Sequence, residues 1–200
     1  MFVAEAPPEN IERFFYYEDV KTGDALFINL MRVLYPELRE ENNGKVEDIR
    51  RNKAKLLKRF QADGYYLIDA LPEPISLKLT SKNRMRLIEK RKAEIADDIY
   101  NLLGDTPPKT PVPDRGVILI KATVFDALEQ YLAKDSRLFV LNSMFKLPFP
   151  SHGNTKTFAK MLHKVLSRSD RRYRLATRFV SYDGDIIVHN KEQATYDIYL

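Results

Sequence analysis

The chain lacks cysteine, and only seven of its 200 residues are glycine. The absence of cysteine excludes disulfides, thiolate zinc sites and cysteine-bound iron–sulfur clusters, and it fits a reducing compartment. The scattered glycines form neither a Walker-type phosphate loop nor a glycine-rich dinucleotide turn. The three histidines show no spacing typical of metal ligands. We therefore expect a protein without a cofactor or a bound metal.

Long apolar runs are also missing. The longest, such as residues 116–120, span about five residues, whereas a membrane-spanning helix needs about 20. The N-terminal MFVAEAPPEN lacks the basic segment and the long apolar segment of a signal peptide. These absences predict a cytoplasmic protein with no membrane partner, which we expect to be a monomer.

Positive charge is concentrated near one end of the chain. Residues 150–178 contain eight Lys or Arg and a single acidic residue, Asp170, so this stretch has a net charge of +7. The remainder of the chain has a net charge of −2, which gives +5 for the whole sequence. A positive field attracts phosphate chains or acidic surfaces. The distribution therefore predicts nucleic acid as a partner, with DNA the first candidate.

Short strand patterns alternate with helical patterns along the chain. Strands are expected at residues 2–4, 65–68, 117–121 and 138–141, and helices at 25–35 (with Asp24 as N-cap), 45–62, 81–103, 124–133 and 155–168. This order predicts an α/β fold, a three-layer α/β/α sandwich with a central four-stranded parallel sheet. Residues 177–182 and 185–189 flank an Asp-Gly turn and predict a hairpin. We thus expect an α/β domain over residues 1–175 and a hairpin extension over 176–200.

In a parallel sheet of this kind, ligands bind at the carboxyl ends of the strands. These ends are predicted at residues 5–8, 69–74, 122–123 and 142–152. Glu5 follows the first strand and Asp69 follows the second. An aspartate at such a place is also common as a turn residue. The pattern therefore predicts where the site lies and leaves both interpretations of Asp69 open.

The predicted helix at residues 155–168 has a basic face. Lys156, Lys160, Lys164 and Arg168 follow one another at a spacing of four, and apolar residues line the other side. No glutamate interrupts the series, which favours a surface that follows a phosphate chain over a merely solvated helix face. Just before this helix, Ser151, His152 and Asn154 belong to a loop that could seat a phosphate on free backbone N–H groups, or could simply cap the helix.

Three segments, in order, resemble motifs of the uracil-DNA glycosylase superfamily: FVAEAPP at residues 2–8, YYLIDALPEP at 65–74 and LPFPSHGNTKTFAKML at 147–162. The resemblance covers about residues 2–168. It implies a protein that flips a damaged or deaminated, uracil-like base into a pocket and hydrolyses its N-glycosidic bond. It also implies a first motif at Glu5 and Ala6, a base-reading position at Asp69, a phosphate contact at Ser151 and a base-stacking ring. Phe14, Phe15, Tyr16 and Tyr17 are all candidates for that ring, with Phe15 taken as the representative.

The chain departs from the family pattern at two catalytic positions. Ala6 stands where several branches hold the Asp or Asn that orients water, so Glu5 or another group has to take that role. Phe149 stands where the late-loop His is expected, and His152 would have to act from three residues on. Asp69 replaces an Asn, and an ionised carboxylate can only accept hydrogen bonds, so Asp69 could accept from an exocyclic amine, or bind uracil only if it is protonated.

Three functions follow as hypotheses. The first is a DNA glycosylase-like hydrolase with Glu5 and His152 as catalytic residues, Ala6, Phe15 and Asp69 at the base, and a DNA surface whose members are Ser151, Asn154, Lys156, Lys160 and Lys164. The second is a non-catalytic nucleic-acid-binding relative with the same fold, which Ala6 favours. The third is a hydrolase of a free nucleotide or nucleoside, which the +7 segment disfavours.

Overall fold

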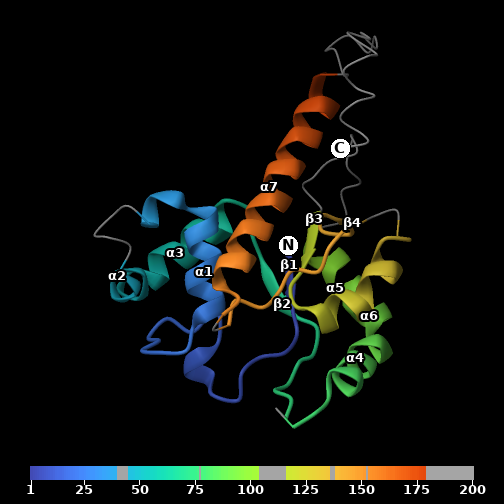
Figure 1. The fold of residues 1–200 in the computed structure, drawn as a ribbon, viewed down its shortest axis with the longest axis horizontal. Helices are drawn as coiled ribbons and strands as arrows, with labels where there is room; N and C mark the ends of the chain where they lie inside the picture. Colours follow the sequence, from blue (N-terminus) through green and yellow to red (C-terminus); the bar gives the residue numbers. More distant parts are fainter. Residues whose placement is uncertain (40–44, 77, 104–115, 136–137, 152, 179–200) are drawn as a thin grey trace.

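A sheet of four parallel strands lies at the centre of the fold (Figure 1). The structure is a computed structural model that describes residues 1–39, 45–76, 78–103, 116–135, 138–151 and 153–178. Its strands are β1 (Phe2–Ala4), β2 (Leu67–Asp69), β3 (Gly116–Leu119) and β4 (Phe139–Val140). They lie in the order β2-β1-β3-β4. The predicted four-stranded parallel sheet is confirmed.

Strand β1 sits between β2 and β3 and aligns their ends. Ala4 is opposite Asp69 in β2, and Val3 is opposite Leu119 in β3. Gly116 of β3 is opposite Phe139 of β4. Because parallel strands point the same way, the residues that follow β1, β2 and β3 meet at one edge of the sheet. Neighbouring strands are about 4.8 Å apart, so these residues lie in a row.

Helices cover both faces of the sheet (Figure 1). One face carries α1 (Ala25–Leu34), α2 (Val46–Arg51), α3 (Lys53–Ala62) and α7 (Thr155–Arg178), and the other carries α4 (Ser81–Lys90), α5 (Lys92–Leu103) and α6 (Ala122–Leu132). Short 3-10 helices occur at Ile11–Arg13 and Pro36–Arg39. Because successive strand residues point to opposite faces, Phe2 belongs to one core and Val3 to the other.

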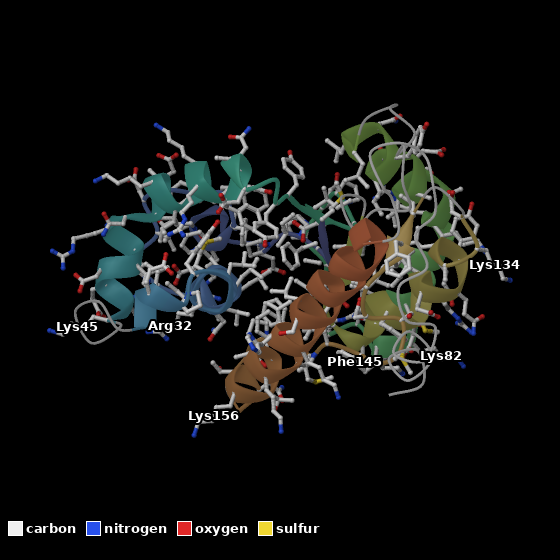
Figure 2. All side chains as sticks on the ribbon, turned by 90° about the horizontal axis from the view of Figure 1, so that it is seen from above. Arg32, Lys45, Lys82, Lys134, Phe145 and Lys156 are labelled. Carbon is white, nitrogen blue, oxygen red and sulfur yellow. The ribbon has the colours of Figure 1, made fainter. Side chains whose placement is uncertain are left out.

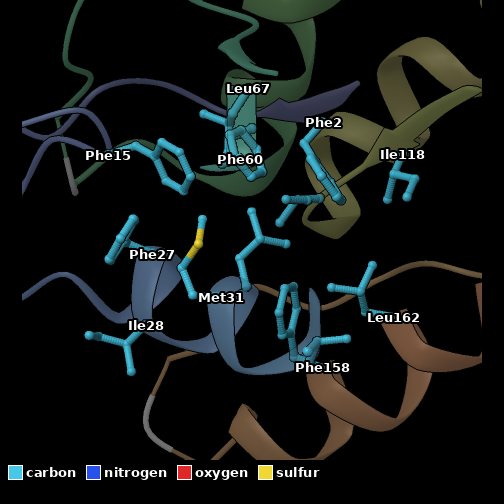
Figure 3. Close-up of a cluster of buried hydrophobic side chains, with 14 of the residues drawn as sticks. Phe2, Phe15, Phe27, Ile28, Met31, Phe60, Leu67, Ile118, Phe158 and Leu162 are labelled. Atoms are coloured by element: carbon cyan, nitrogen blue, oxygen red, sulfur yellow. The ribbon is translucent and has the colours of Figure 1, made fainter. Parts of the chain in front are cut away.

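The first core is rich in aromatic rings (Figure 3). Phe2 stacks on Phe60 of α3, with 6.1 Å between ring centroids, and Phe15 meets Phe27 of α1 edge-on at 5.5 Å. Phe158 of α7 is fully buried in the same cluster. Edge-on and offset contacts of this kind add to the burial energy of the rings. This core therefore fixes the start of α7 and the loop after β1 to the sheet.

Two predicted helices are each split into two. The pattern over residues 45–62 becomes α2 and α3, which meet at Asn52, and the pattern over 81–103 becomes α4 and α5, which meet at Arg91. Arg91 donates a hydrogen bond from Nη1 to the carbonyl of Ala70 at 2.8 Å and pairs through Nε with Glu94. Apolar spacing alone predicted continuous helices, because a break fixed by a distant carbonyl leaves no trace in the periodicity.

Helix α7 is longer than predicted. It continues from Thr155 to Arg178, and the sequence contains no glycine or proline between these residues that would end it. The predicted first hairpin strand, residues 177–182, is therefore wrong at Thr177 and Arg178, which are helical; the rest of the hairpin and its packing lie outside the described residues. Within the described chain, no helix has both the length and the apolar composition needed to cross a membrane.

Candidate functional site at the carboxyl ends of the strands

A pocket of about 590 Å³ opens at the carboxyl ends of β1, β2 and β3. The chain leaves β1 towards β2 on one side and returns to β3 on the other, so the direction of the strand order changes at β1. Ligands in open parallel sheets bind beyond the strand ends at such a point. The walls come from the loop after β1, from the strand ends, from the start of α1 and from the loop before α7. The predicted location of the site therefore holds a pocket.

Five of the residues singled out from the sequence line this pocket together: Glu5, Ala6, Phe15, Asp69 and Ser151. They come from three segments that are far apart in the chain. Asn154 and the three lysines of α7 are not among its described lining residues. His152, the other predicted catalytic residue, lies outside the described residues.

Glu5 is the most heavily bonded side chain of the pocket. Its carboxylate is 9% exposed. Oε1 accepts a hydrogen bond from the hydroxyl of Thr123, and Oε2 pairs with Arg84 Nη1 at 3.2 Å and with Lys121 Nζ. The carboxylate therefore has partners at both of its oxygens, which fixes its position in the pocket. Glu5 thus anchors basic side chains of the pocket as well as lining it.

Lys121 occupies an unusual backbone conformation. It follows β3 and stands before α6 with φ 83° and ψ 142°. It is the one non-glycine residue with positive φ in the described chain. This region of backbone space is open to glycine but costs other residues about 1–3 kcal/mol, and such strain gathers at functional sites. The Lys121 side chain lines the pocket and remains 30% exposed.

Asp69 ends β2 and lines the pocket next to Glu5 in the row of strand ends. Burial disfavours the charged carboxylate and raises the pKa of Asp69 to about 6. An aspartate with this pKa is protonated in a substantial fraction of molecules in mildly acidic solution. In that form the carboxyl group offers a donor and an acceptor, as an amide does.

Residues 14–17, the aromatic loop, follow β1. Some of its rings are fixed to the sheet or the core, and Phe14 lines the pocket. Tyr16 is tied to the edge of the sheet, because its hydroxyl donates to the carbonyl of Leu67 and accepts from the N–H of the same residue, both at 2.9 Å. Phe15 touches the pocket but is only 5% exposed, since it packs into the core. Phe14 is half-buried and lines the pocket. Phe149, treated in the sequence only as a missing His, also lines it and is 37% exposed.

A largely buried ionic cluster adjoins the pocket at Asp24, which is one of the lining residues. Arg50 donates to Asp24 Oδ1 from Nε at 3.0 Å and from Nη2 at 2.7 Å. Asp24 is the N-cap residue of α1, but its side chain makes no capping hydrogen bond because it faces Arg50. Beside it the fully buried Lys53 donates to the carbonyl of Phe14 at 3.3 Å and lies 4.5 Å from the ring centroid of Phe27. Burial lowers the pKa of Lys53 to about 8. This cluster holds the backbone of the aromatic loop in place.

Helix α7 begins beside the pocket. The carbonyl of Ser151 accepts from the N–H of Asn154 at 2.9 Å, and the carbonyl of Asn154 accepts from the N–H of Phe158 at 2.8 Å, which is the first helical bond. Lys156, Lys160 and Lys164 are exposed, whereas Phe158, Leu162 and Val165 are buried. Figure 2 shows Lys156 pointing away from the body of the protein at the first turn. The predicted division of this helix into a basic face and an apolar face is confirmed as far as Val165, whereas the side chain of Arg168 lies outside the described residues.

The sequence reasoning missed Arg84, Lys121 and the ionic cluster at Asp24, whereas Thr123, which bonds to Glu5, lies in the strand end predicted at residues 122–123. Arg84 belongs to α4, and it lies 79 positions from Glu5 in the sequence, so no local sequence pattern could predict their contact. Lys121 did leave a signal. It is the charged residue that follows an apolar run, and the strand was predicted to end at residue 121, two residues later than the observed end of β3 at Leu119.

In the part of the chain that the structure describes, no group of three His, Asp or Glu side chains is arranged to hold a metal ion. No protein-family model, curated protein or solved structure matches this chain.

Proposed function

We propose that the protein is a DNA glycosylase-like hydrolase that takes a damaged or deaminated, uracil-like base into the pocket at the strand ends. One observation carries this proposal: Glu5, Ala6, Phe15, Asp69 and Ser151, which were selected from the sequence alone, line a single pocket. A pocket of about 590 Å³ lies in the usual size range of small-molecule sites. The resemblance to the uracil-DNA glycosylase superfamily supplies the reaction, and the pocket supports it.

In the proposed reaction the base lies against Asp69, with Phe14 or Phe149 as the stacking ring. The oxygen of a water molecule bonds to the sugar C1′, the N-glycosidic bond breaks, and its electron pair leaves with the base. The water gives its proton to the carboxylate of Glu5, which follows β1 between the ends of β2 and β3, and this proton then neutralises the departing base. The exposed lysines of α7 hold the phosphate chain outside the pocket.

An oligonucleotide panel tests this proposal. Duplexes and single strands carrying uracil, hypoxanthine or xanthine are incubated with the protein and scored for abasic sites. Glu5→Gln should lower abasic-site formation by about 10²-fold or more, the usual loss for a positioned acid–base group. Glu9→Gln is the matched control, because Glu9 lines the same pocket but is exposed. Equal activity of the two variants would contradict the assigned role of Glu5.

A second candidate is a binding protein of the same fold without catalysis. The observation that favours it is that both oxygens of the Glu5 carboxylate already have partners, from Thr123, Arg84 and Lys121, which compete with a catalytic water for them. This alternative predicts that no substrate of the panel yields abasic sites, while the protein still binds DNA with a steep dependence on salt concentration.

A further inference from the structure

Two cations pair with the single carboxylate of Glu5 in the pocket, although one would balance its charge. Arg84, with its side chain 13% exposed, already pairs with Glu5, and the Thr123 hydroxyl bonds to the other oxygen. Lys121 adds a second positive charge to the same Glu5 oxygen. Together, Glu5, Arg84 and Lys121 carry a net charge of +1, so an anion at this place would be attracted to them.

The backbone of Lys121 indicates that the ammonium group has a use beyond Glu5. A glycine at this position would have no strain at φ 83°, and Arg84 would still pair with Glu5. The chain instead keeps a lysine in a conformation that costs about 1–3 kcal/mol. Its side chain is more exposed than those of Glu5 and Arg84, and it lines the pocket. Lysine also has three N–H donors, and among the described residues Glu5 accepts one of them.

The strand order places this cation in line with the two acidic residues. Because the sheet runs β2-β1-β3, Asp69, Glu5 and Lys121 follow one another along its carboxyl edge. Two strand spacings separate the ends of β2 and β3, about 10 Å. The base, sugar and phosphate of a nucleotide also follow one another in a row. With the base at Asp69 and the sugar at Glu5, the phosphate reaches Lys121.

We propose that Lys121 is the phosphate-binding residue of the pocket and takes the phosphate group of the nucleotide whose base lies at Asp69. The position of the base rests on the proposed function. The anion site itself requires only the pocket and the cation, so it can be tested without any cleavage. This site is separate from the lysines of α7, which face solvent outside the pocket.

The test uses inorganic phosphate and thermal unfolding of the full chain at constant ionic strength. Phosphate should raise the melting temperature of the parent protein in a saturable way, because a ligand that binds the folded state stabilises it. Lys121→Met removes the charge and should weaken phosphate binding at least about tenfold, as expected for the loss of a charged hydrogen bond. Lys121→Gly should weaken it equally, and its melting temperature without phosphate should exceed that of Lys121→Met because glycine relieves the strain.

Two controls separate this site from other sources of phosphate binding. Lys146→Met removes an exposed lysine that pairs with Asp126, and the triple change of Lys156, Lys160 and Lys164 to Ala removes the basic face of α7. In both variants, phosphate should still raise the melting temperature as much as it does in the parent protein. No shift in the parent protein, or the same shift in Lys121→Met as in the parent, would overturn the proposal.

A final pair of ligands assigns the anion to the phosphate group. Deoxyuridine monophosphate should lose affinity in Lys121→Met, whereas deoxyuridine should bind both proteins alike. An equal loss for the nucleoside would mean that Lys121 contacts the base or sugar and would contradict the proposal. If excision fails while phosphate binding depends on Lys121, the proposed reaction falls and the anion site stands.

Discussion

The pocket and the basic face of α7 both carry charge, but they are built in opposite ways. On α7 the charges are exposed, of one sign and set by a local spacing of four residues. In the pocket they are mostly shielded, of both signs and brought together by contacts such as that between Glu5 and Lys121, 116 positions apart. Exposed charges act over a distance and are weakened by salt, whereas shielded charges act on what enters the pocket. We infer that the two regions have separate roles: α7 binds the phosphate backbone of the nucleic acid, and the pocket recognises the base.

The largest expected effect separates the two faces of α7 itself. Phe158 is fully buried in the core, so Phe158→Ala should lower the free energy of unfolding by about 3–5 kcal/mol. Lys160, two positions later and exposed, should change it by no more than about 0.5 kcal/mol when replaced by Ala. Denaturant titration measures both. A comparable loss at Lys160 would show that the basic face has a structural role.

The next largest effect is the loss of folding free energy that a charged, largely buried Asp69 causes at neutral pH. Its pKa is about 6 in the folded protein and about 3.9 in an unfolded chain. The folded state therefore binds its proton more tightly, and the stability present below about pH 4 is lost as the pH rises through 6. Asp69→Asn avoids this loss. It should be more stable than the parent protein at pH 7 by on the order of 3 kcal/mol, with little difference at pH 4.

Unfolding curves from pH 4 to pH 7 measure this difference. Asp19→Asn, at an exposed carboxyl group, is the matched control and should follow the parent protein throughout. Parallel stability profiles for the parent and Asp69→Asn would mean that Asp69 is as well hydrated as a turn residue at the surface.

These predictions differ in how far the sequence alone supports them. Apolar runs and helical spacing were enough to predict four parallel strands, the edge that holds the site, and the buried side of α7, because these features depend on local periodicity. The same reasoning placed Glu5 and Asp69 at that edge. It could not find Arg84, whose partner is far away in the chain, or the breaks at Asn52 and Arg91. It also ended α7 too early, although the sequence after Arg168 offers no glycine or proline before Arg178.

A smaller effect should appear in the salt dependence of DNA binding. Replacing Lys156, Lys160 and Lys164 with Ala should flatten the log–log plot of affinity against salt concentration by about 0.9 for each phosphate that the variant no longer neutralises. The matched control replaces Lys82, Lys90 and Lys134, which are also exposed but belong to the side of the sheet that α4 and α6 cover. An unchanged slope in the α7 variant would mean that its basic face is only solvated.

The inference that α7 binds the phosphate backbone and the pocket recognises the base is tested most directly by measuring base preference and salt dependence on the same proteins. Binding and abasic-site formation are followed for the base panel with the parent protein, with Asp69→Asn and with the triple lysine variant. We predict that Asp69→Asn shifts the preference towards uracil and leaves the salt slope unchanged, because the amide carries both a donor and an acceptor at any pH. The triple variant should lower the slope and keep the order of preference among bases. Identical base profiles for the parent and Asp69→Asn would contradict the account, because Asp69 would then not read the base.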